Sequence, residues 1–107
     1  MDLGISGKTA VVTGAAGGIG TETTALLLQE GVQVVMVDKD RESLDEAVGR
    51  LPEGLGKPLT VPCDLSSDEA IQELARTVAD LAGEVDILVN GAGITGATGP
   101  FHKIDDD

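Results

Sequence analysis

The stretch best suited to chemistry is TGAAGGIG, Thr13–Gly20, which puts four glycines into eight residues. Glycine is disfavoured inside strands and helices, so this run, the glycine loop, indicates that something comes close to the backbone. The loop lies between an apolar run and a helical pattern, where the first N–H groups of a helix lack partners and attract an anion. Small residues would let a phosphate approach those N–H groups.

The spacing within the glycine loop excludes two common phosphate-binding patterns. A G-x-x-x-x-G-K-[ST] loop needs a lysine where Thr21 follows Gly20, and G-x-G-x-x-G needs a glycine where Thr23 stands. The remaining pattern is T-G-x-x-x-G-x-G, with Gly14, Gly18 and Gly20 as its fixed points. It favours binding of a dinucleotide or a related nucleotide over a merely tight turn.

Asp38 is the second residue that supports a nucleotide site. It ends the second apolar run, 18 positions beyond Gly20 (from 20 to 38). An acid there accepts hydrogen bonds from adenosine ribose hydroxyls in dinucleotide-binding folds. Alone, Asp38 would be better explained as a helix-capping or loop carboxylate, but together with the glycine loop it favours a ribose acceptor.

The other reactive side chains predict no catalytic residue and no metal site. His102 is the only histidine, lies near the end of the chain and has no Cys or His partner for a metal, so we expect a solvated surface residue. The acids Asp105–Asp107 are expected to be solvated as well. Cys63 has apolar neighbours and no adjacent base, which predicts an inert buried thiol.

The composition limits the class of partner and the kind of core. Seven basic and nineteen acidic residues give a net charge of −12 over 107 residues, which argues against nucleic acid or an anionic membrane surface. Phe101 is the only aromatic residue, and tyrosine is absent. The core must therefore consist of Val, Leu, Ile and Ala, as in β-branched strands covered by alanine- and leucine-rich helices.

Four apolar runs rich in β-branched residues predict strands, three of them buried on both faces. They are Thr9–Thr13, Val32–Val37, Pro58–Pro62 and Val85–Val89. Apolar residues at helical spacing fill each interval. The expected buried faces are Ile19, Thr23, Leu26 and Leu27 in the first interval, Leu44, Ala47, Val48 and Leu51 in the second, and Ile71, Leu74, Ala75, Val78 and Ala82 in the third. The order βαβαβαβ predicts a parallel sheet with right-handed crossovers, within a single domain covering 1–107.

Capping residues support these helices. Asp40 is expected to cap the second helix, and Ser66 with Glu69 is expected to form a capping box on the third. Gly31 and Gly83 are expected to terminate the first and third helices.

Four segments resemble the short-chain dehydrogenase/reductase family, in the right order and over nearly all of the chain. GKTAVVTGAAGGIG resembles the family's T-G-x-x-x-G-I-G opening, and VMVDKD its cofactor-selecting strand end. PCDLS resembles the segment whose aspartate lies beside the adenine ring. VNGAG, Val89–Gly93, is similar to the family's N-N-A-G motif, with Gly91 replacing the second asparagine.

The resemblance implies a Rossmann-type, doubly wound parallel α/β sheet, of which this chain holds the amino-terminal, cofactor-binding portion. We expect an incomplete sheet of four strands in the order 3-2-1-4, with the first two helices on one face and the third on the other. The cofactor-binding residues implied are Gly14, Gly18, Ile19, Gly20, Asp38, Asp64, Leu65, Asn90, Ala92 and Gly93.

The implied function is hydride transfer between NAD(H) and an alcohol or ketone substrate. In the family, the catalytic tyrosine, lysine and serine follow these motifs, whereas these 107 residues contain no tyrosine. We therefore expect the chain alone to be inactive. Two alternatives stay open: a stand-alone, non-catalytic nucleotide-binding module, and a fragment of an S-adenosylmethionine-dependent methyltransferase, although the latter usually has a tighter G-x-G-x-G loop.

NAD is expected rather than NADP, because Asp38 would repel the additional 2′-phosphate. No basic residue occurs at 15–17 to offset that charge, although Lys39 and Arg41 could weaken the discrimination.

The start of the chain shows no signal peptide, no apolar run approaches a membrane span, and the single cysteine fits a reducing cytoplasm. The resemblance further implies that the parent protein is a homo-oligomer.

Overall fold

The computed structural model describes residues 4–91, which form alternating strands and helices. The elements are β1 Thr9–Thr13, α1 Gly18–Gln29, β2 Gln33–Asp38, α2 Arg41–Arg50, β3 Leu59–Pro62, α3 Asp68–Ala82 and β4 Ile87–Asn90. This is the predicted order βαβαβαβ. The strand limits differ from the predicted ones by at most two residues at either end.

The four strands form one parallel sheet in the order β3-β2-β1-β4, which confirms the predicted Rossmann-type topology. β1 is central, with Val11 opposite Val35 on one side and Leu88 on the other. The carboxyl ends of the strands lie at one edge, where Thr13 is opposite Asn90 of β4. The direction of winding reverses between β1 and β4, and this is where ligands bind in open α/β sheets.

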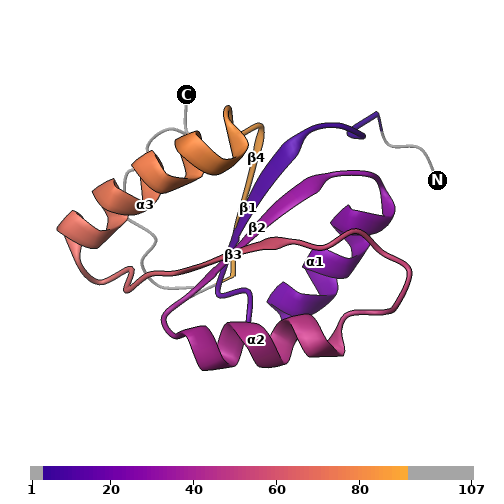
Figure 1. Ribbon diagram of the computed structural model, residues 1–107, viewed down its shortest axis with the longest axis horizontal. Coiled ribbons are helices and arrows are strands. Elements are labelled where there is room, and N and C mark those ends of the chain that lie inside the picture. Colours follow the sequence, from indigo (N-terminus) through magenta and orange to yellow (C-terminus); the bar gives the residue numbers. More distant parts are fainter. Residues whose placement is uncertain (1–3, 92–107) are drawn as a thin grey trace.

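Helices cover the two faces of the sheet unequally, as predicted. Figure 1 shows α1 and α2 on one side of the strands and α3 on the other. Alternate residues of β1 and β2 face the two sides, and all of β1 and residues 34–37 of β2 are buried. Ala10, Val12, Val34 and Met36 pack toward Leu44 and Ala47 of α2, whereas Val11, Val35 and Val37 pack toward Leu74 and Val78 of α3.

The predicted buried face of α1 is wrong in part. Ile19 and Leu26 are 79% and 63% exposed, whereas the buried residues of the helix are Gly20, Thr21 and Thr24. These small residues let α1 approach the sheet closely, so helical spacing of large apolar residues did not identify the packed face. In α3, Ile71, Leu74 and Val78 are buried as predicted, while Ala75 is exposed.

The predicted capping box of α3 is also wrong. Ser67, one residue later, is the N-cap, and its hydroxyl accepts the N–H of Ala70 at 3.2 Å. Ser66 instead donates its own N–H and O–H to the carboxylate of Asp64. The remaining caps are confirmed: Asp40 caps α2, and Gly31 and Gly83 follow α1 and α3 with positive φ.

Candidate functional site

The glycine loop leaves the carboxyl end of β1, and its backbone is held by bonds to three different parts of the chain. The N–H of Ala15 donates to the carbonyl oxygen of Val37 at 3.1 Å, and the N–H of Gly17 donates to that of Gly14 at 3.1 Å. The hydroxyl of Thr21 donates to the carbonyl oxygen of Ala15 at 2.9 Å. The loop is therefore fixed from β2, from within and from α1.

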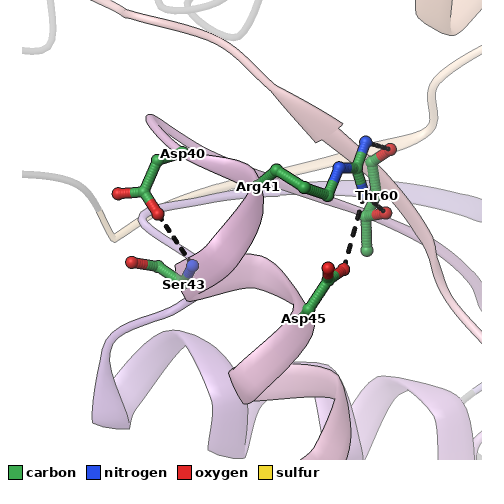
Figure 2. Close-up of polar contacts among 5 residues, drawn as sticks. All are labelled: Asp40, Arg41, Ser43, Asp45 and Thr60. Carbon is green, nitrogen blue, oxygen red and sulfur yellow. Dashed lines mark hydrogen bonds and ion pairs between the residues drawn. The ribbon is translucent and has the colours of Figure 1, made fainter.

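The amino terminus of α1 differs from those of α2 and α3. Its N-cap, Gly17, provides no side-chain cap, and its first turn holds no acid. By contrast, Asp40 accepts the N–H of Ser43 at 2.7 Å in α2, as Figure 2 shows, and both α2 and α3 have acids in the first turn. The N–H groups and the positive end of the helix dipole at α1 are thus left for an anion.

The glycines of the loop differ in what they contribute. Gly14 has a φ of +65°, which other residues adopt at a cost. A Cβ on Gly20 would lie closer than 3.0 Å to the Gly14 carbonyl oxygen and to Cα of Ala15. Gly18 faces open space. Gly14 and Gly20 shape the junction of β1 and α1, whereas Gly18 leaves the space in front of the amino terminus of α1 open.

Asp38 ends β2 and is half-buried beside the glycine loop. Its Oδ2 accepts the N–H of Ala16 at 2.9 Å, and its Oδ1 accepts the N–H of Lys39 at 2.7 Å. A carboxylate offers about four lone-pair positions, so these two bonds leave it able to accept ribose hydroxyls. The structure therefore brings Asp38 together with the loop, in contact with its middle.

Three basic residues lie near this end of β2, and sequence analysis considered only two of them. The guanidinium of Arg41 donates a hydrogen bond to Thr60 of β3 and lies 3.8 Å from the carboxylate of Asp45, one turn further along α2 (Figure 2). Hydrogen bonds from Ser43 lower the pKa of Asp40, and hydrogen bonds from Ser66 lower that of Asp64. The positive charge of Lys39 adds a smaller contribution in the same direction to both.

Arg50 is the basic residue that sequence analysis missed. Its Nη2 donates to the carbonyl oxygen of Ala16 at 2.9 Å, across 34 positions of the chain. It is the last residue of α2. No motif or spacing marks Arg50, because the contact depends on how α2 lies relative to the glycine loop.

Asp64 and Leu65 follow β3, next to β2 at the outer side of the sheet. Oδ1 of Asp64 accepts the hydroxyl of Ser66 at 2.6 Å and its N–H at 2.9 Å. These two bonds, the hydroxyl first, lower the pKa of Asp64 below its ordinary value. Asp64 is exposed, whereas Leu65 is half-buried because it packs against the buried cluster under α3.

Asn90 ends β4 and connects it to β1. The hydroxyl of Thr13 donates to Oδ1 of Asn90 at 3.0 Å. The next residue, Gly91, donates its N–H to the carbonyl oxygen of Thr13, and a Cβ on Gly91 would lie only 3.0 Å from that oxygen. The departure from the family motif at Gly91 therefore fits a close approach of two backbones. Ala92 and Gly93 lie outside the described residues, as do His102 and Asp105–Asp107.

Cys63 is a buried free thiol, as predicted. Its Sγ donates to the carbonyl oxygen of Ala70, and burial raises its pKa, with further contributions from the charges of Asp64 and Glu73. A raised pKa keeps the thiol protonated and unreactive.

Within residues 4–91, no helix is both long enough and apolar enough to cross a membrane.

Comparison with known proteins connects this geometry to one family. Residues 8–107 match the sequence model of the family described as short chain dehydrogenase. The chain is 43% identical over 92 residues to 1-deoxy-11-beta-hydroxypentalenate dehydrogenase of Streptomyces avermitilis, covering 86% of this chain and 34% of that protein. It thus spans about a third of the length of that curated relative.

Solved structures agree in fold and differ in the nicotinamide dinucleotide that they hold. The L-sorbose reductase of Gluconobacter frateurii, complexed with NADPH and L-sorbose, matches with a TM-score of 0.78 at 38% identity, over 90% of this chain and 37% of the other. An NAD+-bound xylitol dehydrogenase matches with a TM-score of 0.76 at 36% identity, over 87% of this chain and 36% of the other.

Proposed function

Since the chain belongs to the short-chain dehydrogenase/reductase family, we propose that it is the NAD-binding half of an oxidoreductase that transfers hydride between NAD(H) and an alcohol or ketone. The observation that carries the proposal is the pairing of an uncapped α1 terminus with Asp38. That terminus lacks both a capping side chain and an acid in the first turn, while Asp38 contacts the loop leading to it. A phosphate and a ribose need these two features together.

The donor and acceptor set fits the parts of a dinucleotide. The first turn of α1, beginning at Gly18, holds the pyrophosphate through backbone N–H groups, and Ile19 lies exposed beside it. Asp38 accepts the adenosine ribose hydroxyls. Asp64 and Leu65 flank the adenine, and residues 90, 92 and 93 line the remainder of the cofactor site. When bound, the nicotinamide supplies the hydride or accepts it.

NAD is proposed over NADP because of the charge on Asp38. The solved relatives include one structure with NADPH and one with NAD+, so the choice for this chain rests on its own residues. Arg41 is engaged with Thr60 and Asp45, which leaves it less able to offset that charge than its position in the sequence suggested. A 2′-phosphate beside a half-buried carboxylate is unfavourable.

A stand-alone, non-catalytic nucleotide-binding module is the second candidate, because the glycine loop and Asp38 account for cofactor binding without a catalytic residue. A Tyr-x-x-x-Lys motif encoded downstream in the same reading frame would dismiss it. The methyltransferase alternative is set aside, because the family match covers residues 8–107.

The proposal places the protein in the cytoplasm, where a reduced thiol such as Cys63 is stable, and in a homo-oligomer.

Calorimetric titration of the complete polypeptide encoded by the gene tests the proposal. NADH is expected to bind, NADPH to bind more weakly, and S-adenosylmethionine not to bind. The matched control is Glu22→Gln, which removes one exposed acid from the outer side of α1 and should leave the NADH affinity within about two-fold, as expected for a screened surface charge. Failure of NADH to bind would contradict the proposed function.

A further inference from the structure

Three successive peptide groups of the glycine loop are bonded at both of their polar atoms. In the group joining residues 14 and 15, the oxygen accepts from Gly17 and the N–H donates to Val37. In the next group, the oxygen of Ala15 accepts from Thr21, and the N–H of Ala16 donates to Asp38. In the third, the oxygen of Ala16 accepts from Arg50, and the N–H of Gly17 donates within the loop.

This pattern changes at the start of α1. The oxygen of Gly17 accepts the N–H of Thr21 as the first helical bond. The N–H groups of residues 18–20 belong to the first turn, where a helix has no partner of its own to offer, and no side chain caps them. The loop therefore uses its earlier donors internally and leaves those of residues 18–20 for a ligand.

Arg50 differs from the other contacts in this set. The remaining partners are backbone atoms, the short side chain of Thr21, or Asp38, which is anchored at the end of β2. Arg50 reaches the loop from the far end of α2 through an exposed side chain. It holds the oxygen of Ala16 while Asp38 holds the N–H of the same residue, so opposite charges fix one residue from two elements.

We propose that Arg50 is a positioning residue of the dinucleotide site, which orients the peptide between Ala16 and Gly17 so that the following N–H groups point at the pyrophosphate. This inference rests on the proposed function. A hydrogen-bond donor at residue 50 reduces the set of conformations that the loop samples before it binds, and such preorganisation raises affinity without any contact to the ligand.

The variants Arg50→Met and Arg50→Lys test the inference in the complete polypeptide. Methionine keeps much of the side-chain length without a donor, whereas lysine keeps one donor and the charge. For Arg50→Met, the affinity for NAD and for ADP-ribose is expected to fall about three- to ten-fold, the usual effect of one lost hydrogen bond. Arg50→Lys is expected to recover most of this loss.

Two further measurements separate positioning from general stability. Adenosine carries no phosphate, so its affinity, measured by ligand-observed NMR, should be unchanged in Arg50→Met. Hydrogen exchange of the peptide covering residues 14–20 should become faster in the unliganded variant. Arg76→Met, an exposed arginine of α3, serves as the matched control and should alter none of these quantities.

The outcomes distinguish this inference from the function on which it rests. If the unsubstituted protein binds neither NAD nor ADP-ribose, the proposed function fails, and the inference fails with it. If that protein binds both and Arg50→Met binds them equally well, only the inference is overturned. An equal loss of adenosine affinity, or unchanged exchange in residues 14–20, would also overturn it, because either would mean that Arg50 does not order the loop.

Discussion

Asp38 and Ala16 are joined by a hydrogen bond of 2.9 Å between the carboxylate Oδ2 of the first and the backbone N–H of the second. The residue expected to select the cofactor is therefore also a support of the loop that holds the phosphates. An alanine at residue 38 would remove both roles together. Asparagine removes the charge and keeps an oxygen that can accept the N–H of Ala16, so it is the more informative substitution.

For Asp38→Asn, we expect the affinity for NADP to rise relative to that for NAD. Two unit charges at 4 Å repel by about 1 to 4 kcal/mol at effective dielectric constants of 80 to 20, so the ratio should change between about five-fold and nearly a thousand-fold. Lys39 nearby places the expected value toward the lower end. Isothermal titration with both cofactors measures the ratio.

The control for this substitution is Asp80→Asn, which removes an equal charge from an exposed position of α3, the helix that covers the other face of the sheet from α1 and α2. It should leave the cofactor ratio unchanged. NADP binding as tight as that of NAD to the unsubstituted protein would contradict the assignment of Asp38 as the selecting residue.

Gly20→Ala and Gly18→Ala are expected to act in opposite ways on stability. At Gly20 a Cβ would press against the backbone of Gly14 and Ala15, so the free energy of unfolding should fall by about 1 to 3 kcal/mol, as for overpacked sites. At Gly18 the space is open, and alanine should raise that free energy by about 0.4 to 1 kcal/mol. Urea denaturation measures both. Gly18→Ala should nevertheless weaken NAD binding, because its methyl group would stand at the entrance to the helix terminus.

Stability is expected to depend on pH through Asp64. Its bonds from Ser66 lower its pKa in the folded chain below the ordinary value of 3.8. The corresponding stabilisation is therefore complete above about pH 4 and is lost as pH falls through the lower, folded pKa. Ser66→Ala removes the hydroxyl donor, so NMR titration should show the pKa of Asp64 moving up toward 3.8.

The neighbouring serine provides the control for that titration. Ser67→Ala removes the cap of α3 and should lower the free energy of unfolding by about 1 kcal/mol at neutral and at acidic pH alike. It should leave the pKa of Asp64 where it is. Equal effects of the two substitutions on that pKa would show that the bond from Ser66 is not its cause.

The order of elements was predictable from the sequence because its signals are local. β-branched runs and helical spacing of apolar residues depend on which side of a segment is buried, and they do not depend on which other segment packs against that side. The packed face of α1 was not predictable in this way, since it consists of Gly20, Thr21 and Thr24. These residues are buried because their small side chains let α1 approach the sheet, not because they are apolar. The exposed Ile19 and Leu26 gave the misleading signal.

The candidate site was predictable only where a motif marks it. The glycine loop and Asp38 belong to patterns with a known spacing, and the structure places them in contact. Ser66 and Ser67 are adjacent residues of one type, and a local pattern does not decide which of them caps α3. Arg50 could not be found, because its contact with Ala16 depends on the relative placement of two elements 34 positions apart.

We expect the 107-residue chain by itself to self-associate or to unfold readily. Among the described residues, β4 pairs only with β1, and Ile87, Leu88 and Val89 are half-buried. An apolar strand at the edge of a sheet is a template for pairing with another chain, and a domain of this size has little stability to spare. Light scattering coupled to size exclusion, over a range of concentrations, should show a mass above that of the monomer. A monomeric peak with a cooperative thermal transition would contradict this expectation.

The last expectation is that these 107 residues, tested alone with alcohols or ketones, transfer no hydride. The reaction requires a group that exchanges the hydroxyl proton at a suitable pKa, and its absence costs about 10²- to 10⁴-fold in rate. In the family that group is a tyrosine, and this chain has none. Formation of NADH, followed by absorbance in chain free of host dehydrogenases, measures the activity. Turnover that disappears in Asp38→Ala would show that the chain supplies a proton-exchanging group of another kind, and the assignment as the cofactor-binding half alone would be wrong.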